Sequence, residues 1–105
     1  MSAPISDTLA ATAPEVQLLQ SQDDLKILAV SGQAGQTMPR HRCSHAAFMR
    51  VMAGEVSLNL ADQPPRRLVA GEHFLIPAMH WHDLQLVQAS QLQVLMQTNA
   101  KIFFA

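Results

Sequence analysis

The sequences MPRHRCSH at residues 38–45 and PAMHWHD at residues 77–83 hold most of the chain's chemically reactive side chains. Together they contain four of the five histidines, the only cysteine and the only tryptophan. Histidine titrates near neutral pH and has a nitrogen lone pair that binds metal ions, so it is often used for chemistry. Two such stretches in a small chain predict a fold that brings them toward each other.

The segments around these stretches have the length and pattern of β-strands. Residues 55–60, EVSLNL, alternate apolar and polar side chains, and short apolar runs at 25–30, 46–53 and 73–76 are bounded by turn residues. A period of two is typical of strands with one buried face. Many short strands with closely spaced turns are typical of barrels and sandwiches. We therefore predict eight to ten strands in a closed antiparallel barrel or sandwich, with no helix beyond a turn.

Glycine, histidine and proline residues are also separated by characteristic intervals in the sequence. Intervals of five, one, three and six residues separate Gly35, His41, Cys43, Ala47 and Gly54. Intervals of five, one, two and three residues separate the positions of the second series, which are Gly71, Pro77, Met79, His82 and Leu86. These spacings over residues 35–86 resemble the two motifs of a small single-domain bacterial cupin. The resemblance implies an all-β fold, a single cupin-type antiparallel β-barrel or jelly roll.

The resemblance implies where a metal would bind. In cupins that hold a metal, the ligands come from the positions of His41, Cys43, Ala47 and His82, and only two of these are histidine here. Cys43 lies two residues from His41, so both would share one face of a strand. Its thiol is either a metal ligand or a small buried apolar group, and the sequence leaves both open.

Two further histidines could replace the missing ligands. His45 continues the parity of His41 and Cys43, so it would point inward unless a loop interrupts the strand and leaves it at the mouth. His80 lies in the turn before His82, where it is either a substitute ligand or a solvated turn residue. The candidate metal ligands are therefore the following residues: His41, Cys43, His82, His45 and His80.

The donor types limit the metal and its chemistry. An iron site of two histidines and one carboxylate needs an acid where this chain has Ala47. Nitrogen and sulfur ligands with an open position suit a divalent transition metal, namely Zn, Ni, Cu or Fe. Such a metal could activate water or bind a small oxygenated ligand as a Lewis acid. An enzyme of this kind would be a metal-dependent dioxygenase, isomerase or lyase.

Two other functions stay open. In one, the barrel is a metal-free module that binds or senses a small molecule, and the substituted motif positions reflect lost catalysis. In the other, the domain is mainly a structural or regulatory partner. His41 and His82 would then be hydrogen-bonded core histidines. We favour metal and small-molecule binding, because an inert barrel does not require so many soft and borderline ligands.

Composition indicates one small domain. The chain has 105 residues, of which 49% are apolar, enough for one core. We assign residues 1–14 to an arm rich in alanine, serine, threonine and proline, and residues 15–105 to the barrel. A formal net charge of −1 does not favour nucleic acid or an anionic membrane as a partner. One cysteine and no long apolar stretch lead us to expect a cytoplasmic protein.

Strand 46–53 also predicts self-association. Ala47, Met49 and Val51 fill one parity, while Phe48 and Met52 lie on the other. A strand in a single-layer barrel normally has one polar face, so a second subunit or the 1–14 arm should cover the outer one. Small cupins are often dimers, and we expect a homodimer. The alternative is a monomer whose own sheets and arm hide both faces.

Overall fold

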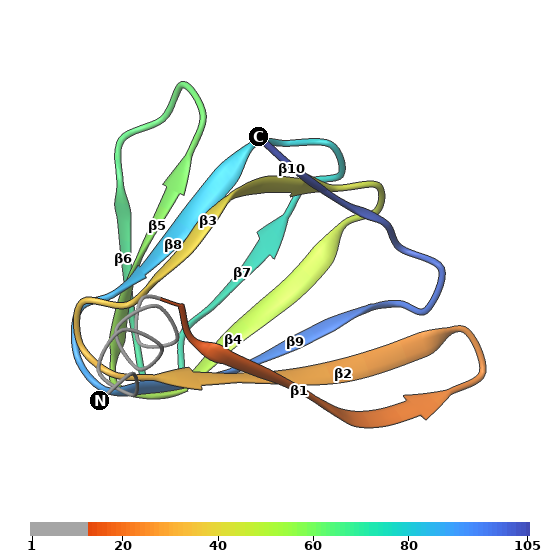
Figure 1. Cartoon of the computed structure of the whole chain (residues 1–105), viewed down its shortest axis with the longest axis horizontal. Coiled ribbons are helices and arrows are strands. Elements are labelled where there is room, and N and C mark those ends of the chain that lie inside the picture. Colours follow the sequence, from red (N-terminus) through yellow and green to blue (C-terminus); the bar gives the residue numbers. More distant parts are fainter. Residues whose placement is uncertain (1–12) are drawn as a thin grey trace, which may run out of the picture.

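The structure is a computed structural model that describes residues 13–105. Ten strands form two five-stranded antiparallel sheets (Figure 1). Sheet A has the order β1 (Glu15–Gln22), β2 (Leu25–Gly32), β9 (Ser90–Gln97), β4 (Ala47–Ala53), β7 (His73–Ile76). Sheet B has the order β10 (Ile102–Phe104), β3 (Thr37–Cys43), β8 (His82–Leu86), β5 (Glu55–Leu60), β6 (Arg66–Val69). The predicted all-β architecture of eight to ten antiparallel strands is confirmed.

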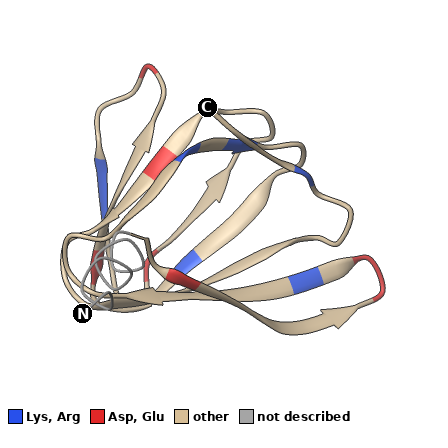
Figure 2. Ribbon diagram, in the orientation of Figure 1, with Lys and Arg blue, Asp and Glu red and all other residues tan. Residues whose placement is uncertain are grey.

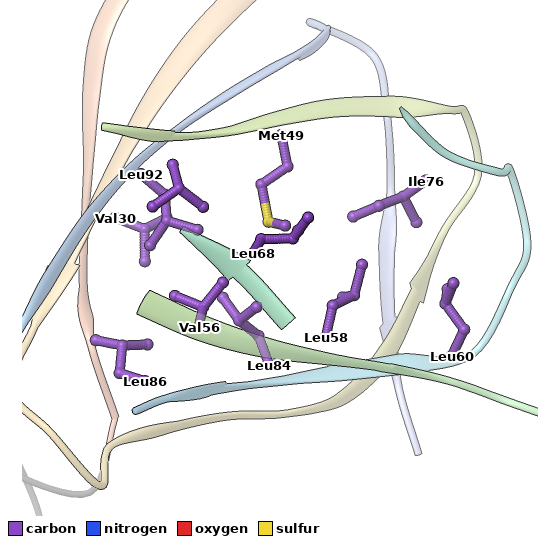
Figure 3. Close-up of a cluster of buried hydrophobic side chains, with 11 residues drawn as sticks. Val30, Met49, Val56, Leu58, Leu60, Leu68, Ile76, Leu84, Leu86 and Leu92 are labelled. Atoms are coloured by element: carbon purple, nitrogen blue, oxygen red, sulfur yellow. The ribbon is translucent and has the colours of Figure 1, made fainter. Parts of the chain in front are cut away.

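The core lies between the two sheets because the strand alternation points the same apolar parity inward. In sheet A, the pairing of β2, β9 and β4 places Val30, Leu92 and Val51 in one buried row. Leu86 and Val56, paired between β8 and β5, supply the matching row of sheet B. Figure 3 shows Val30, Leu92, Val56 and Leu86 between the layers. The burial of such side chains stabilises the fold through the hydrophobic effect.

Two turn glycines adopt a backbone conformation that glycine favours. Gly54 and Gly71 have φ of 89° and 90°, a region that residues with a Cβ rarely adopt. At Gly54 a Cβ would also overlap the carbonyl oxygen of Ala89 and the hydroxyl of Ser90. Only glycine therefore fits the tight β4–β5 connection without moving the neighbouring loop.

The outer face of sheet A carries an apolar row. The register places Ile27, Leu95, Phe48 and Leu75 side by side across β2, β9, β4 and β7. Phe48 is 36% exposed and Leu75 is 61% exposed. Within residues 13–105 this row therefore stays partly exposed, on the strand face for which the sequence predicts cover by the arm or by a second subunit. Residues 1–12 of the predicted arm lie outside the described residues, and Pro14 is buried.

Charged residues do not gather on one face of the described chain. Figure 2 shows basic and acidic residues spread along the strands and turns of both sheets. One ion pair links Arg67 to Glu55 between β6 and β5. Among residues 13–105 there is no helix long and apolar enough to cross a membrane.

Candidate functional site

A β-bulge in β3 brings the first histidine to the inside of the barrel. Met38 pairs with Leu84 of β8 and His41 pairs with His82, so two residues of β3 lie opposite one residue of β8. Because of this extra residue, Met38 and His41 both point inward although they are three positions apart. Proline at position 39 is consistent with a bulge, since it has no N–H to give to the ladder.

The bulge places the imidazole ring of His41 beside that of His82, which belongs to the second histidine stretch. The ring centroids of His41 and His82 are 4.2 Å apart. Nδ1 of His41 donates to the carbonyl of Pro39 at 2.7 Å, and Nδ1 of His82 donates to the carbonyl of His80 at 2.8 Å. A neutral imidazole with its proton on Nδ1 has its lone pair on Nε2. Both rings therefore keep Nε2 as an acceptor or as a metal ligand.

Burial determines the charge of His82. The side chain is only 5% exposed, and this desolvation lowers the pKa of His82 below 6.5, with a smaller contribution from the nearby His41. The hydrogen bond to the carbonyl of His80 acts in the opposite direction, and burial outweighs it. His82 is therefore neutral at pH 7, which is the state that binds a metal or accepts a hydrogen bond.

The pair lies in the wall of a cavity of about 220 Å³ between the sheets. Apart from His41, His82 and Cys43, the lining side chains are aliphatic, thioether or phenyl groups. They come from both sheets and from the edge strands β1 and β10: Val16, Leu28, Val30, Met38, Ala47, Met49, Leu58, Ile76, Leu84, Leu92, Val94, Met96, Ile102 and Phe104. Val16 of the edge strand β1 and Ile102 and Phe104 of the edge strand β10 line the cavity and are exposed, so we infer that the cavity opens between these two edges.

The five candidate ligands occupy different places. Cys43 is buried in the cavity wall and packs with Ala47 and Met96. His45 is half-buried in the loop after β3, where its Nδ1 shares a 2.8 Å hydrogen bond with the hydroxyl of Ser44. The ring of His80 is also absent from the cavity lining, and that residue contributes its carbonyl to His82.

The described side chains bring two histidines into contact without a third ligand beside them. No group of three or more His, Cys, Asp or Glu residues that could hold a metal ion occurs within residues 13–105. A metal held by the His41–His82 pair alone would have the remaining positions of its coordination shell filled by water or by a bound molecule. Ala47, at the position where the resemblance implies an acid, supplies only a methyl group.

Backbone contacts hold the two motifs together. The N–H of Met79 donates to the carbonyl of Cys43 at 2.7 Å, which ties the turn before His82 to the end of β3. Met79 has φ of 59°, an uncommon value for a residue with a side chain. On the other side of the pair, the Phe104 ring of β10 lies 5.7 Å from the His41 ring. The histidine pair is therefore fixed by the backbone on one side and by an aromatic contact on the other.

Sequence reasoning missed the apolar side chains that shape the cavity. Met38 was hidden because simple alternation puts it on the face opposite His41, and the proline at position 39 was the available sign of a bulge. Ile102 and Phe104 pair with Cys43 and His41 in the register of β10 and β3. That pairing joins residues 102–104 to residues 41–43, which are far away in the sequence, so local periodicity could not predict it.

Solved structures share this arrangement of strands. An RmlC-like cupin with a double-stranded β-helix fold from Methanocaldococcus jannaschii is similar with a TM-score of 0.73 and 21% identity, covering 83% of this chain and 82% of that one. A Klebsiella pneumoniae protein with a double-stranded β-helix domain gives 0.78 and 18%, covering 89% and 84%. The DMSP lyase DddQ from Ruegeria pomeroyi gives 0.79 and 22%, covering 89% of this chain and 52% of the lyase. The chain thus spans about half of the lyase. At these identities the likeness establishes the fold, which is that of a cupin.

The sequence places the chain within this class. Residues 27–98 match the family model of the AraC-like ligand binding domain. Because the match covers more than half of the chain, the chain belongs to that family. No curated protein sequence matches it.

Proposed function

We propose that the protein binds a small molecule in the cavity between its sheets, with the His41–His82 pair holding the polar group of that molecule. The observation that carries this proposal is a close pair of histidines in the wall of a largely apolar cavity. Apolar pockets with a few convergent polar groups are typical small-molecule sites. Membership of a ligand-binding domain family supports the same conclusion.

A variant in which a larger side chain fills the cavity tests this proposal. Ala47 is buried in the lining, and Ala47→Phe would occupy much of the space that a ligand needs. We expect a chemically mixed fragment collection to contain compounds that raise the melting temperature of the wild-type protein and leave that of Ala47→Phe unchanged. Compounds that stabilise both proteins equally bind elsewhere. If every stabilising compound behaves in that way, the cavity is not the binding site.

The second part of the proposal is a divalent transition metal, Zn, Ni, Cu or Fe, bound by Nε2 of His41 and His82. Metal-binding histidines commonly donate their other ring N–H to a carbonyl, and both rings do so here. Cys43, two residues from His41 and in the same cavity wall, is the first candidate for a third ligand. A metal at this place would act as a Lewis acid toward the polar group of the ligand.

Metal analysis after dialysis tests the second part. Wild-type protein without a histidine tag should retain stoichiometric metal, and His41→Ala and His82→Ala should each abolish it. His45→Ala and His80→Ala are matched controls, because these rings do not line the cavity and their loss should leave the metal content unchanged. Cys43→Ser shows whether sulfur contributes, since a hydroxyl is a much poorer ligand for these ions.

A metal-free binding or sensor module is the alternative function. The lack of a third ligand beside the pair within residues 13–105 favours it. Wild-type protein that retains none of the four metals, together with cavity-dependent stabilisation by a fragment, would establish this alternative.

We also propose a homodimer that buries the apolar row of sheet A, formed by Ile27, Leu95, Phe48 and Leu75. Large exposed apolar patches on proteins commonly mark an interface, and a second copy offers the same row. Phe48→Glu would place a charge in the centre of the interface. Sedimentation equilibrium should give a dimer for the wild type and a monomer for Phe48→Glu, and a wild-type monomer at micromolar concentration would contradict the proposal.

The proposal includes a cytoplasmic location, where the free Cys43 would stay reduced.

A further inference from the structure

The lining of the cavity limits the chemistry of its ligand. Within residues 13–105 the lining includes no Lys, Arg, Asp, Glu, amide or hydroxyl side chain. A sugar or a zwitterion would have to give up its hydrogen bonds to water against side chains such as Leu28, Met49 and Val94, and that loss is costly. The body of the ligand is therefore apolar.

The polar end of the cavity requires a hydrogen-bond donor. His41 and His82 both use Nδ1 to donate to backbone carbonyls, so both keep an acceptor nitrogen. Cys43 adds only a weak donor. A carboxylate would bring further acceptors to this place, and within residues 13–105 the lining has no Lys or Arg to receive it. A hydroxyl group, in contrast, donates directly to an imidazole nitrogen.

The volume limits the size of the ligand. Apolar cavities of about 150 Å³ bind benzene, so a cavity of about 220 Å³ accommodates about nine non-hydrogen atoms. Those atoms are enough for one aromatic ring, one hydroxyl group and a short alkyl substituent.

The mouth of the cavity favours an aromatic body. Val16 of β1 and Ile102 and Phe104 of β10 line it and are 49%, 46% and 63% exposed. Phe104 also contacts the ring of His41, so an aromatic ligand beside the histidine pair would meet a phenyl ring that is already in place. Offset or edge-to-face contacts between such rings are favourable.

From these four observations we propose that the ligand is a small phenol, whose hydroxyl donates to Nε2 of His82 or His41 and whose ring fills the apolar part of the cavity. This inference rests on the proposed binding function and names the ligand class for the same site. It does not require the metal, because the imidazole nitrogen itself accepts the hydroxyl proton in a hydrogen bond.

Three probes of similar size test the proposal by calorimetry. They are 4-ethylphenol, ethylbenzene, which lacks the hydroxyl, and xylitol, which lacks the apolar ring. The full chain is first dialysed against EDTA, so that the hydroxyl meets imidazole and no metal. We expect 4-ethylphenol to bind about tenfold more tightly than ethylbenzene, the effect of one hydrogen bond in an apolar site, and xylitol not to bind. Equal affinities for the two aromatic probes, or tighter binding of xylitol, would overturn the proposal.

Variants assign the effect to the histidine pair. His82→Leu or His41→Leu, whichever removes the ring that accepts the hydroxyl, should reduce the affinity for 4-ethylphenol to that for ethylbenzene and leave ethylbenzene binding unchanged. His80→Leu, outside the cavity lining, should preserve the difference. If His82→Leu does not melt cooperatively, His41→Leu replaces it. A tenfold preference that survives loss of both acceptor rings would contradict the assignment.

The outcomes separate the ligand class from the binding function. If 4-ethylphenol does not bind but another fragment stabilises the wild type and not Ala47→Phe, the phenol assignment is wrong and the binding function stands. If no compound distinguishes the wild type from Ala47→Phe, both are wrong.

Discussion

The closed end and the open end of the barrel follow the same strand pattern and differ in how the interior is filled. At the closed end, Val51, Val56 and Leu86 are fully buried and do not line the cavity. At the open end, His41 and the edge strands β1 and β10 surround empty space. Alternation therefore specifies which side chains point inward, and the size of those side chains determines whether the interior is a core or a cavity.

This difference suggests that the closed end mainly stabilises the fold and that the open end binds the ligand. A closely packed core stabilises the fold through burial and dispersion contacts. The side chains around a cavity make fewer such contacts, so a cavity reduces the stability of the fold. At the open end the interior is less filled because Ala47 is small, and it is less apolar because His82 is a buried polar residue. We expect substitutions at the closed end to change stability and substitutions at the open end to change binding.

The largest expected effect is the loss of a core side chain. Leu86→Ala at the closed end should lower the free energy of unfolding by about 3 kcal/mol, because it removes buried methyl groups and leaves a cavity. Phe104→Ala at the open end should cost less than about 1 kcal/mol, since its ring is mostly exposed. Urea unfolding of both variants measures the contrast. Similar losses would show that the two ends contribute alike.

Two glycines with nearly the same φ give a smaller contrast. Gly54→Ala should destabilise the protein by about 2–3 kcal/mol, because the new methyl group adds an overlap with Ala89 and Ser90 to the backbone strain. Gly35 has φ of 90°, and a methyl group there would meet no atom within 4 Å, so Gly35→Ala should cost about 1 kcal/mol from strain alone. Thermal unfolding of the pair separates steric overlap from strain, and equal losses would exclude the overlap.

The smallest expected effect is a pH dependence at the open end. The folded-state pKa of His82 lies below 6.5, so between the two values the unfolded chain binds a proton that the folded chain does not. The contribution of neutral His82 is complete above pH 6.5 and declines as the pH falls from 6.5 toward the folded-state pKa. His82→Gln should reduce this decline in urea unfolding between pH 7 and pH 5. An unchanged decline in the variant would assign it to other groups.

The sequence predicted the fold because fold information is local in this chain. Alternation in residues 55–60 and the turn glycines Gly54 and Gly71 are sufficient to indicate strands and their connections. The spacing of His41 and His82 within the two motifs indicated that the rings would meet, and they lie in contact. Each of these features depends on residues close in the sequence or on a resemblance to a known fold.

The rest of the site depends on contacts that local patterns do not contain. The bulge in β3 changes which residues share a face with His41, so simple parity does not reveal that Met38 also points inward. For His45 the sequence left two alternatives, an inward direction or a loop that interrupts the strand, and the strand ends at Cys43 with His45 in the following loop. The cavity itself arises where the edges β1 and β10 leave an opening, and its volume depends on the packing of both sheets.

The proposed binding function requires that His41 and His82 keep their Nε2 atoms available to a ligand in the cavity. Long-range ¹H–¹⁵N NMR resolves the two ring nitrogens of each histidine and measures this state directly. At pH 7.5 both rings should carry the proton on Nδ1, and addition of zinc or 4-ethylphenol should shift Nε2 of His41 and His82 while His45, His73 and His80 stay unchanged. Protons on Nε2 of both rings, or shifts confined to the other three histidines, would contradict the account.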